Sequence, residues 1–368
     1  MFPYFVLFLV IVIWGMVCNP KERISERVLF IVPVFALMIA LASVRDVSVG
    51  VDTEMYCRSY KLIGAMGWSS FGLVRFEPAF TFLCLLLNQF SSNYQLLICA
   101  TALLIYAPIG YAIARYSDNC LMSTYMFVAL TLFTSYMNIM RQGIAVAFVL
   151  LAFFALVRRK KIVFVLLVLF ASLFHSSALV FLLLLPLSFV PFRRKYIVAY
   201  CLLCVMAVAA TELYSALAKL LLGKEQLYNP AYTGSNYFGA VIQAFFGCFF
   251  ILLCVNYIEV RKENGIKSYY YDLIEHALFL WLLFLMLGIK IEIFARLGYY
   301  FQILVIFAVP LALKAPGRVE RIVVGSFLCL LAFGYFVAIG LLRPEWQGVV
   351  PYVANIGNTV FMFGELIS

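Results

Sequence analysis

Arg141, His175 and Arg296 each stand at the start of a long apolar run, in a chain that is 66% hydrophobic and 12% charged. A buried ionised group costs several kcal/mol unless it is paired, so charges kept beside such runs usually mark a site. An arginine guanidinium is a planar fork of donors that suits phosphate oxygens. The three residues therefore predict a binding site for an anionic group, and a diphosphate would neutralise them.

Each of these cations also has a purely structural interpretation. Arg141 could extend its charge to the membrane interface while its stem stays in lipid. His175, in LFHSSAL, could be a satisfied turn residue ahead of a helix that Ser176 or Ser177 caps. Arg296 lies four residues after Glu292, so a local ion pair on one helical face is the competing explanation.

Aromatic side chains follow Arg296 directly, at Tyr299, Tyr300 and Phe301. They could offer a surface on which a sugar stacks. Aromatic belts at membrane interfaces are the more common use of such clusters.

Carboxylates that could act as a base occur early in the chain, in SVRDVSVGVDTEMY. Gly50 permits a tight turn that would let Asp52 point back toward the membrane, where it could take a proton from a hydroxyl nucleophile. Arg45 and Tyr56 flank it, and local pairing between Arg45 and its acidic neighbours is the alternative. Glu77 is the second candidate base, although an ion pair with Arg75 could equally anchor the FEPAF segment.

The composition predicts a polytopic membrane protein, because a mean hydropathy of +1.04 over 368 residues exceeds what a soluble domain can solvate. The first 17 residues lack a basic leading region and a cleavage pattern, so we expect a retained span. We predict an all-α protein with about twelve transmembrane helices that form one integral membrane domain, 1–368. The expected spans are 1–18, 28–43, 94–114, 119–137, 142–157, 162–174, 176–190, 196–215, 237–258, 272–290, 297–313 and 323–341.

Segment 74–90 is apolar as well, and the distribution of Lys and Arg indicates whether it crosses, because these residues collect on the cytoplasmic side. If it does not cross, 17 of the 27 basic residues are cytoplasmic; if it does, only 9 are. We therefore expect 44–93 to be one external loop whose helix 74–90 lies on the membrane surface or re-enters it. The 17 are Lys21, Arg23, Arg27, Arg115, Arg158, Arg159, Lys160, Lys161, Arg193, Arg194, Lys195, Arg261, Lys262, Lys267, Lys314, Arg318 and Arg321.

The hairpin between Lys161 and Arg193 is too short for two full crossings. Each limb has about 14 residues, or ~21 Å of helix, against a hydrocarbon core of ~30 Å. The turn at His175 is therefore expected below the outer surface, in a hollow lined by other helices.

Five motifs, in this order, carry a resemblance to a known family: VGVDTEMY after a basic residue, FEPAF, MRQGIA, FHSSAL and ARLGYYF. Together they resemble the EpsG family of Wzy-type polysaccharide polymerases, which make O-antigen, exopolysaccharide or capsule. The resemblance runs from about Arg45 to the PEWQGVVPY tail. Thr53 departs from it, because relatives often place an aromatic residue after the Asp.

That resemblance implies a membrane glycosyltransferase with a layout related to the GT-C fold, in the bacterial plasma (inner) membrane, with its active site outside the cytoplasm. It implies transfer of a growing glycan from undecaprenyl diphosphate to a hydroxyl of another lipid-linked repeat unit. The expected partners are that lipid-linked oligosaccharide and membrane lipid, with room for a chain-length regulator protein and no nucleic acid.

The expected roles follow from the chemistry of glycosyl transfer, which needs a base and a stabilised leaving group. Asp52 or Glu77 would be the base in an inverting reaction. His175 and His276 are predicted on opposite sides of the membrane and no Asp-x-Asp occurs, so we expect neither a metal nor a cofactor. The diphosphate would be bound by Arg141, His175 and Arg296, assisted by Arg45 or Arg75, and the sugar by Tyr56, Tyr299 and Tyr300.

Two other classes of protein remain open. A flippase or exporter of lipid-linked oligosaccharide would also need an arginine-lined cavity, but it would spread its charges through both leaflets and carry an internal repeat. An acyltransferase or lipid phosphatase would pair a histidine with a carboxylate at His-x-x-x-x-Asp or His-x-x-x-x-Glu spacing, and neither pattern is expected at the outer face.

Overall fold

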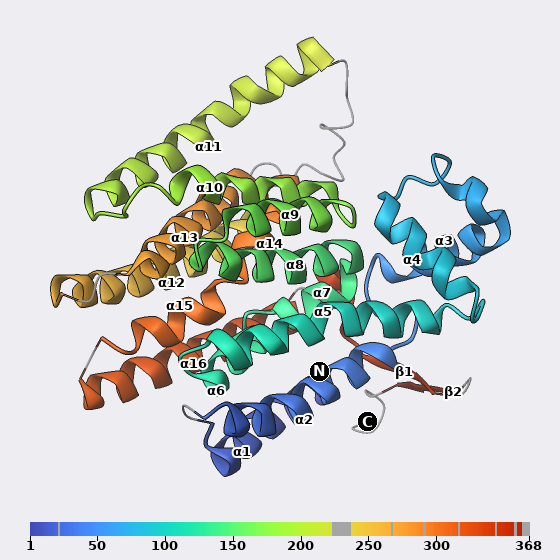
Figure 1. Ribbon diagram of the computed structural model, residues 1–368, viewed down its shortest axis with the longest axis horizontal. Helices are drawn as coiled ribbons and strands as arrows, with labels where there is room; N and C mark the ends of the chain where they lie inside the picture. Colours follow the sequence, from blue (N-terminus) through green and yellow to red (C-terminus); the bar gives the residue numbers. More distant parts are fainter. Residues whose placement is uncertain are drawn as a thin grey trace. The chain divides into compact units, whose positions relative to one another are not determined.

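The architecture is known from a computed structural model, in which almost every described element is a helix (Figure 1). Lys21, Lys267 and the side chain of Glu292 lie outside the described part of the chain. The structure describes residues 1–20, 23–222, 237–265, 268–289, 292–315, 317–342, 344–356 and 359–362.

Six described helices are long and apolar enough to cross a membrane. Each has at least 18 residues, and a helix of 20 residues spans about 30 Å, the thickness of a hydrocarbon core. They are α2 (Ile24–Ser43), α5 (Gln95–Tyr116), α8 (Met140–Val157), α12 (Tyr237–Glu263), α13 (Tyr269–Gly288) and α16 (Arg318–Leu342).

Two further spans would each consist of a bent helix pair. α6 (Cys120–Ala129) and α7 (Leu132–Asn138) meet at 52°, and α14 (Glu292–Gln302) and α15 (Val305–Ala312) meet at 47°. The first bend lies at Thr131, whose φ of 59° takes the backbone out of the right-handed helix. Counting each pair once gives up to eight spans among the described residues.

The remaining predicted spans fall on shorter helices, so the prediction of twelve spans is not established. The stretch of each helix whose side chains are described has 10–17 residues, fewer than the 18 of the six long helices. The multi-pass, helical character of the protein agrees with the prediction, and twelve spans stays an expectation. These stretches are α1 (Phe2–Cys18), α4 (Pro78–Asn88), α9 (Lys161–Ser172), the 3-10 helix η2 (Ser176–Leu183) with α10 (Leu184–Leu187), and the part Lys195–Ala207 of α11 (Lys195–Leu222).

The chain forms two compact units. The first consists of residues 1–153, 163–179 and 318–368, and the second of residues 154–162 and 180–317. In the first unit, α2 packs along α5, and α6 contacts both α1 and α16. In the second unit, α13 contacts α11, α12 and α14.

The early loop of the first unit carries two helices, of which only the second was predicted. α3 (Thr53–Met66) packs against α4 and buries Tyr56, Tyr60 and Ile63. Their spacing is that of one helical face, since residues three and four apart are neighbours. α4 has 11 residues, about 16 Å, which is too short to cross a hydrocarbon core. This length agrees with the prediction that 74–90 does not cross.

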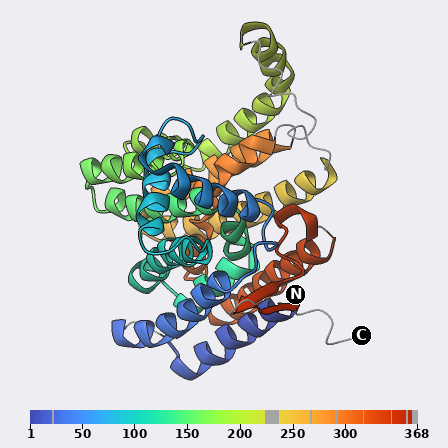
Figure 2. The same ribbon diagram turned by 90° about the vertical axis from the view of Figure 1, so that its right-hand side faces the viewer.

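A C-terminal tail is bonded to the same loop (Figures 1 and 2). After α17 (Pro344–Gln347) the chain forms an antiparallel hairpin of β1 (Val353–Ile356) and β2 (Thr359–Met362), the one departure from the all-α prediction among the described residues. The N–H of Asp46 donates to the carbonyl of Val353 (2.9 Å), and the N–H of Gly50 donates to that of Gly348 (2.7 Å). The loop is therefore fixed by residues from the far end of the chain.

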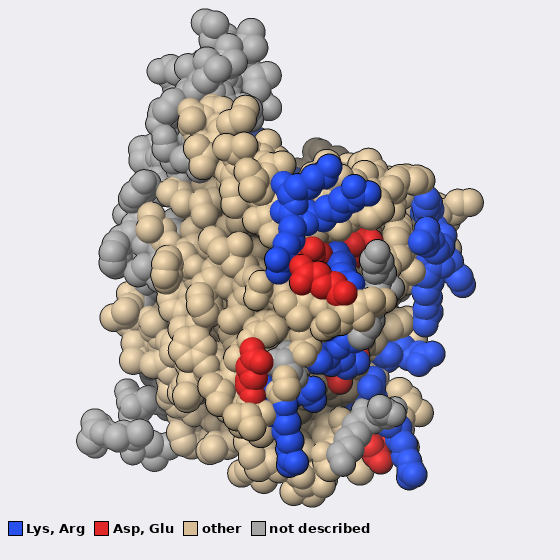
Figure 3. Space-filling view, turned by 90° about the vertical axis from the view of Figure 1, so that its left-hand side faces the viewer, with Lys and Arg blue, Asp and Glu red and all other residues tan. Residues whose placement is uncertain are grey.

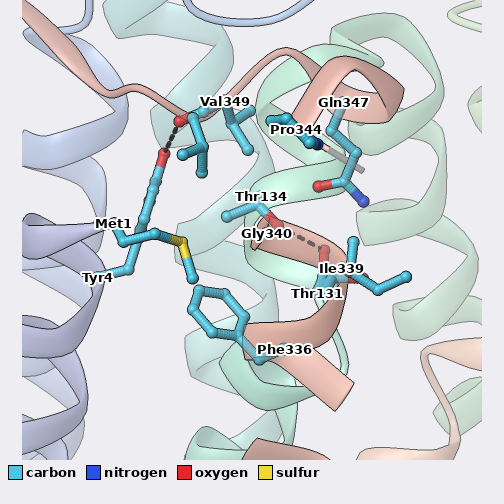
Figure 4. A pocket seen from close by; sticks show the side chains of 11 residues that line it. Met1, Tyr4, Thr131, Thr134, Phe336, Ile339, Gly340, Pro344, Gln347 and Val349 are labelled. Carbon is cyan, nitrogen blue, oxygen red and sulfur yellow. Dashed lines mark hydrogen bonds between the residues drawn. The ribbon is translucent and has the colours of Figure 1, made fainter. Parts of the chain in front are cut away.

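Helix α1 is also hydrogen-bonded to the C-terminal tail (Figure 4). The hydroxyl of Tyr4 donates to the carbonyl of Val349 (2.9 Å), next to a cavity of about 20 Å³ that Thr131, Thr134 and Gln347 help to line. That volume is enough for about one water molecule.

Charged side chains are unevenly distributed on the face in Figure 3, where Lys and Arg gather toward one side of the view. In the second unit, Lys262 is paired with Glu259 (2.9 Å), Asp272 (2.8 Å) and Glu275. The orientation of the protein in the membrane was predicted from the basic residues of the loops, and it remains a prediction.

Candidate active site

Glu77 is the centre of the site, and the following proline sets its backbone. A residue before proline is restricted to extended conformations, and Glu77 has φ −65° and ψ 150°. It is the residue before the first turn of α4, yet its side chain does not cap that helix. The carboxylate is therefore available to groups from elsewhere in the chain.

Four groups from two distant segments bind this carboxylate, one of them the hydroxyl of Ser176, which donates to Oε1 at 3.4 Å. Nη1 of Arg141, at the start of α8, donates to Oε2. Nδ1 of His175 lies 3.0 Å from Oε1, and the backbone N–H of Ser176 donates to the same oxygen at 3.1 Å. Because an ionised carboxylate only accepts hydrogen bonds, the proton of this contact belongs to Nδ1 of His175. The sequence predicted Arg141 and His175 as site residues, and the structure brings them together.

The electrostatics of Glu77 follow from these contacts. Burial alone raises the pKa of the carboxyl, because it disfavours the charged form. The hydrogen bonds from His175 and Ser176 and the charge of Arg141 outweigh burial and lower the pKa to about 2. Glu77 is therefore a fixed negative charge at neutral pH and a weak base.

The guanidinium of Arg141 also lies over two aromatic rings. Its central carbon lies 4.5 Å from the ring centroid of Phe76 and 5.7 Å from that of Tyr56. Only 16% of the Arg141 side chain is exposed, and its Nε–H is buried without an acceptor among the described residues. A buried donor without a partner costs about 1–3 kcal/mol, so this N–H is suited to an anionic ligand. Interfacial snorkelling does not describe such an inward-facing arginine.

Asp52 lies just before α3 and is tied to the same region. Its backbone N–H donates to Oδ1 of Asn138 (2.8 Å), three residues before Arg141, and Tyr56 is one helical turn further along α3. The half-buried carboxylate of Asp52 has no hydrogen-bond partner among the described residues. Gly50 makes the predicted turn with φ +100°, a conformation that other residues rarely adopt.

Comparison with family models decides the identity of the protein. The model of the EpsG family matches residues 28–354, nearly the whole chain. This chain belongs to the EpsG family. Comparisons with curated proteins and with solved structures find no match. The EpsG family is a family of Wzy-type polymerase-like proteins, which indicates a multi-pass membrane protein with a polysaccharide polymerase-like role.

Within this EpsG-family chain, Arg45 is buried and its guanidinium binds backbone carbonyls. Only 1% of it is exposed, and its guanidinium donates to the carbonyls of Ala42 and Met137, the latter at 2.9 Å. It also forms an isolated β-bridge to Ala354. Arg45 therefore joins α2, α7 and the tail, and no contact of its guanidinium with Glu77 or Arg141 occurs in the described structure.

Arg75 and Glu77 do not form the ion pair that their spacing allowed. Glu77 is occupied by Arg141 and His175, and the exposed side chain of Arg75 makes no ion pair with a described residue. An exposed arginine two residues before the site is available to a ligand.

The predicted residues of the ARLGYYF motif lie on α14, in the second unit. Arg296 is exposed, whereas Tyr300 is fully buried and Phe301 stacks on Phe284 with ring centroids 5.7 Å apart. The ring of Tyr300 is thus part of the core, and Tyr299 is half-buried. Since the positions of the two units relative to one another are not determined, the structure does not test whether Arg296 joins Arg141.

Sequence reasoning missed Phe76 and Asn138 and gave Ser176 only the role of a helix cap. Phe76 precedes Glu77 in the FEPAF motif, and Asn138 lies three residues before Arg141, so spacing offered a signal for both. In the described part of the chain, no group of three or more His, Cys, Asp or Glu side chains is arranged to hold a metal ion. The metal-independent reaction remains an expectation.

Proposed function

We propose that this protein is a membrane polysaccharide polymerase that transfers a growing glycan from undecaprenyl diphosphate to a hydroxyl of another lipid-linked repeat unit. The observation that carries the proposal is the geometry around Arg141. Glu77 fixes one edge of the guanidinium, and among the described residues the buried Nε–H lacks an acceptor. Asp52, whose carboxylate is unpaired in the same described part, is bonded through its backbone to Asn138, three residues before Arg141. A cation beside a free base is what transfer from a diphosphate requires.

In this proposal Asp52 is the base. It takes the proton of the acceptor hydroxyl while that oxygen bonds to the anomeric carbon of the donor glycan. The bond between that carbon and the diphosphate oxygen breaks, and undecaprenyl diphosphate leaves with the electron pair. Attack from the side opposite the leaving group inverts the anomeric centre.

Arg141 stabilises the charge that develops on the leaving diphosphate, because preorganised positive charge acts most strongly where charge appears in the transition state. His175 assists as the imidazolium, whose Nε2–H can donate to a phosphate oxygen; Nε2 makes no hydrogen bond among the described residues while Nδ1–H donates to Glu77. Arg75 and Arg296 are further exposed cations for the diphosphate. Glu77, with a pKa of about 2, serves in this proposal as the positioning residue for Arg141 and His175 and not as the base.

The placement in the cell belongs to the same proposal. Twelve spans with a GT-C-like layout in the bacterial inner membrane would place loop 44–93 and the site outside the cytoplasm, where lipid-linked repeat units are joined. The excess of basic residues in the opposite loops supports this orientation.

The test is reconstitution of the purified protein in vesicles with a lipid-linked repeat unit. We expect a ladder of longer glycans that grows with time, and none with vesicles that lack the protein. Translocation of the lipid-linked unit across the same vesicles without any ladder would overturn the proposal in favour of a flippase.

A further inference from the structure

A second polar hollow lies in the first unit, on the side of α3 that faces the start of α5. Its volume is about 470 Å³, within the range of small-molecule sites. Lys61 of α3 lines it, together with residues 91–95 of the α4–α5 link and Asn355 of β1. Nothing in the proposed reaction uses these residues.

Hydrogen bonds fix the three segments that form the hollow. The hydroxyl of Tyr60 donates to the carbonyl of Ser91 (2.5 Å), which joins α3 to the link. Gln95 donates to the carbonyls of Ser43 and Arg45, and the N–H of Asn355 donates to that of Val44 (2.7 Å). The walls are therefore held in place without a ligand.

Both donors and acceptors of the lining remain free. Oδ1 of Asn93 accepts from the N–H of Gln95 (2.9 Å), which leaves the Asn93 amide NH₂ available. The hydroxyl of Ser92 makes no hydrogen bond with a described residue, and Gln95 uses its NH₂ but not its carbonyl oxygen. Such a mixture suits hydroxyl groups, which both donate and accept.

Lys61 is the only charged residue among the described residues that line the hollow. Its ammonium lies 5.2 Å from the ring centroid of Tyr94 and forms no ion pair among the described residues. Hydrogen bonds in which one partner is ionised are about twice as strong as neutral ones, so a carboxylate would gain most here. One ammonium among neutral amides and hydroxyls is a weak site for a diphosphate, which would need several cations.

We propose that this hollow is a second saccharide-binding site, which takes a glycan segment with free hydroxyls and one carboxylate, as in a uronic acid. The inference rests on the proposed polymerase function. Lys61 is nine residues after Asp52, about 14 Å along α3, so the hollow is separate from the reacting atoms. It would hold the glycan at a distance from the transfer site.

Direct binding tests this proposal with two probes of equal length, a tetrasaccharide that contains uronic acid and a neutral tetrasaccharide. Calorimetry with the full-length protein in nanodiscs should show the acidic probe binding at least tenfold more tightly. Lys61→Gln should remove that preference, and Asn93→Ala should weaken both probes several-fold. Lys160→Gln, an exposed lysine of the α8–α9 link, is the matched control and should change neither.

Binding that is equal for the two probes, or unchanged in both Lys61→Gln and Asn93→Ala, would overturn the proposal. A competition experiment with inorganic phosphate gives a further test. If phosphate displaces the acidic probe at a concentration below the dissociation constant of the probe, the hollow is a phosphate site and the proposal is overturned. Asp52→Asn and Arg141→Lys should leave probe binding intact. If the protein makes a glycan ladder but does not bind the probes, only the proposed saccharide site is rejected. If it binds the probes but makes no ladder, only the proposed polymerase reaction is rejected.

Discussion

The carboxylate of Glu77 binds the guanidinium of Arg141 although the two residues are 64 positions apart. Each side chain is 16% exposed, so the pair is largely removed from water. Glu77 directly precedes the short helix α4 of the loop, and Arg141 lies in the first turn of the long helix α8. The ion pair therefore fixes the loop to the helical bundle at the place where we locate diphosphate binding.

Arg141→Lys should reduce glycan elongation at least tenfold, or about 1.4 kcal/mol of transition-state free energy. A lysine keeps the charge but loses the planar fork that can bind Glu77 and a phosphate together. The measurement is ladder formation in vesicles, with membrane insertion checked by yield. Arg58→Lys is the control, because Arg58 pairs with Glu54 on an exposed helix face. Near-normal elongation by Arg141→Lys would count against diphosphate contact.

Asp52→Asn should lower turnover by about 10²–10⁴-fold, the range expected for loss of a general base. The amide keeps the size of the side chain, so binding of the lipid-linked substrate should change little. Single-turnover kinetics and substrate binding, measured separately, test this. Glu54→Gln removes an exposed carboxylate two residues away and should leave the rate unchanged. Weakened binding with normal turnover in Asp52→Asn would require another base.

Glu77→Gln should destabilise the folded protein, since it leaves the charge of Arg141 without its partner. Removing one member of a buried ion pair costs about 3–5 kcal/mol, and the partial exposure here places the effect near the lower end. Thermal unfolding in detergent measures it. The double variant Glu77→Gln with Arg141→Met should recover part of the loss, and additive losses would show that the two residues are not coupled.

The stability conferred by Glu77 should depend on pH in a defined direction. The folded protein holds the pKa of this carboxyl at about 2, below its ordinary value of 4.5, so the unfolded chain takes up the proton first. The contribution, at most about 3 kcal/mol, is complete above pH 4.5 and is lost as the pH falls toward 2. Unfolding temperatures of wild type and Glu77→Gln should converge below pH 4.5. A constant difference down to pH 3 would contradict the assignment.

Gly50→Ala should reduce elongation, because the loop before Asp52 has no room for a methyl group. A Cβ at Gly50 would lie 2.5 Å from Oγ1 of Thr53, in addition to the strain of φ +100°. Gly72→Ala is the matched control: its φ is +82°, but no atom lies within 4 Å of the new Cβ. If both variants lose the same activity, backbone strain and not displacement of Asp52 is responsible.

Much of the site could be predicted because charge stands out in an apolar chain. Arg141, His175 and Glu77 were found as isolated polar residues beside apolar runs, and the structure joins them. Their partnership could not be read from the sequence, since Arg75 was the nearer cation to Glu77. Only the tertiary structure shows that the carboxylate faces α8 and the His175 turn.

Arg45 shows the limit of the same reasoning. Its charge suggested a ligand, but a guanidinium can also bind backbone carbonyls that a helix end leaves unpaired, and Arg45 does so at Ala42. The helix α3 was not predicted although its buried face has helical spacing, because its many polar residues separate it from the continuous apolar runs that mark spans. The β1–β2 hairpin was missed because its four-residue strands carry too little pattern.

The bonds between Gly50 and Gly348 and between Asp46 and Val353 join two segments that are far apart in the sequence. A ribosome makes one partner of each bond about 300 residues before the other. The segment that carries Asp52 is therefore fixed by these bonds only after residues 348–353 have been made. A newly made chain would hold Asp52 in its final position only after that stage.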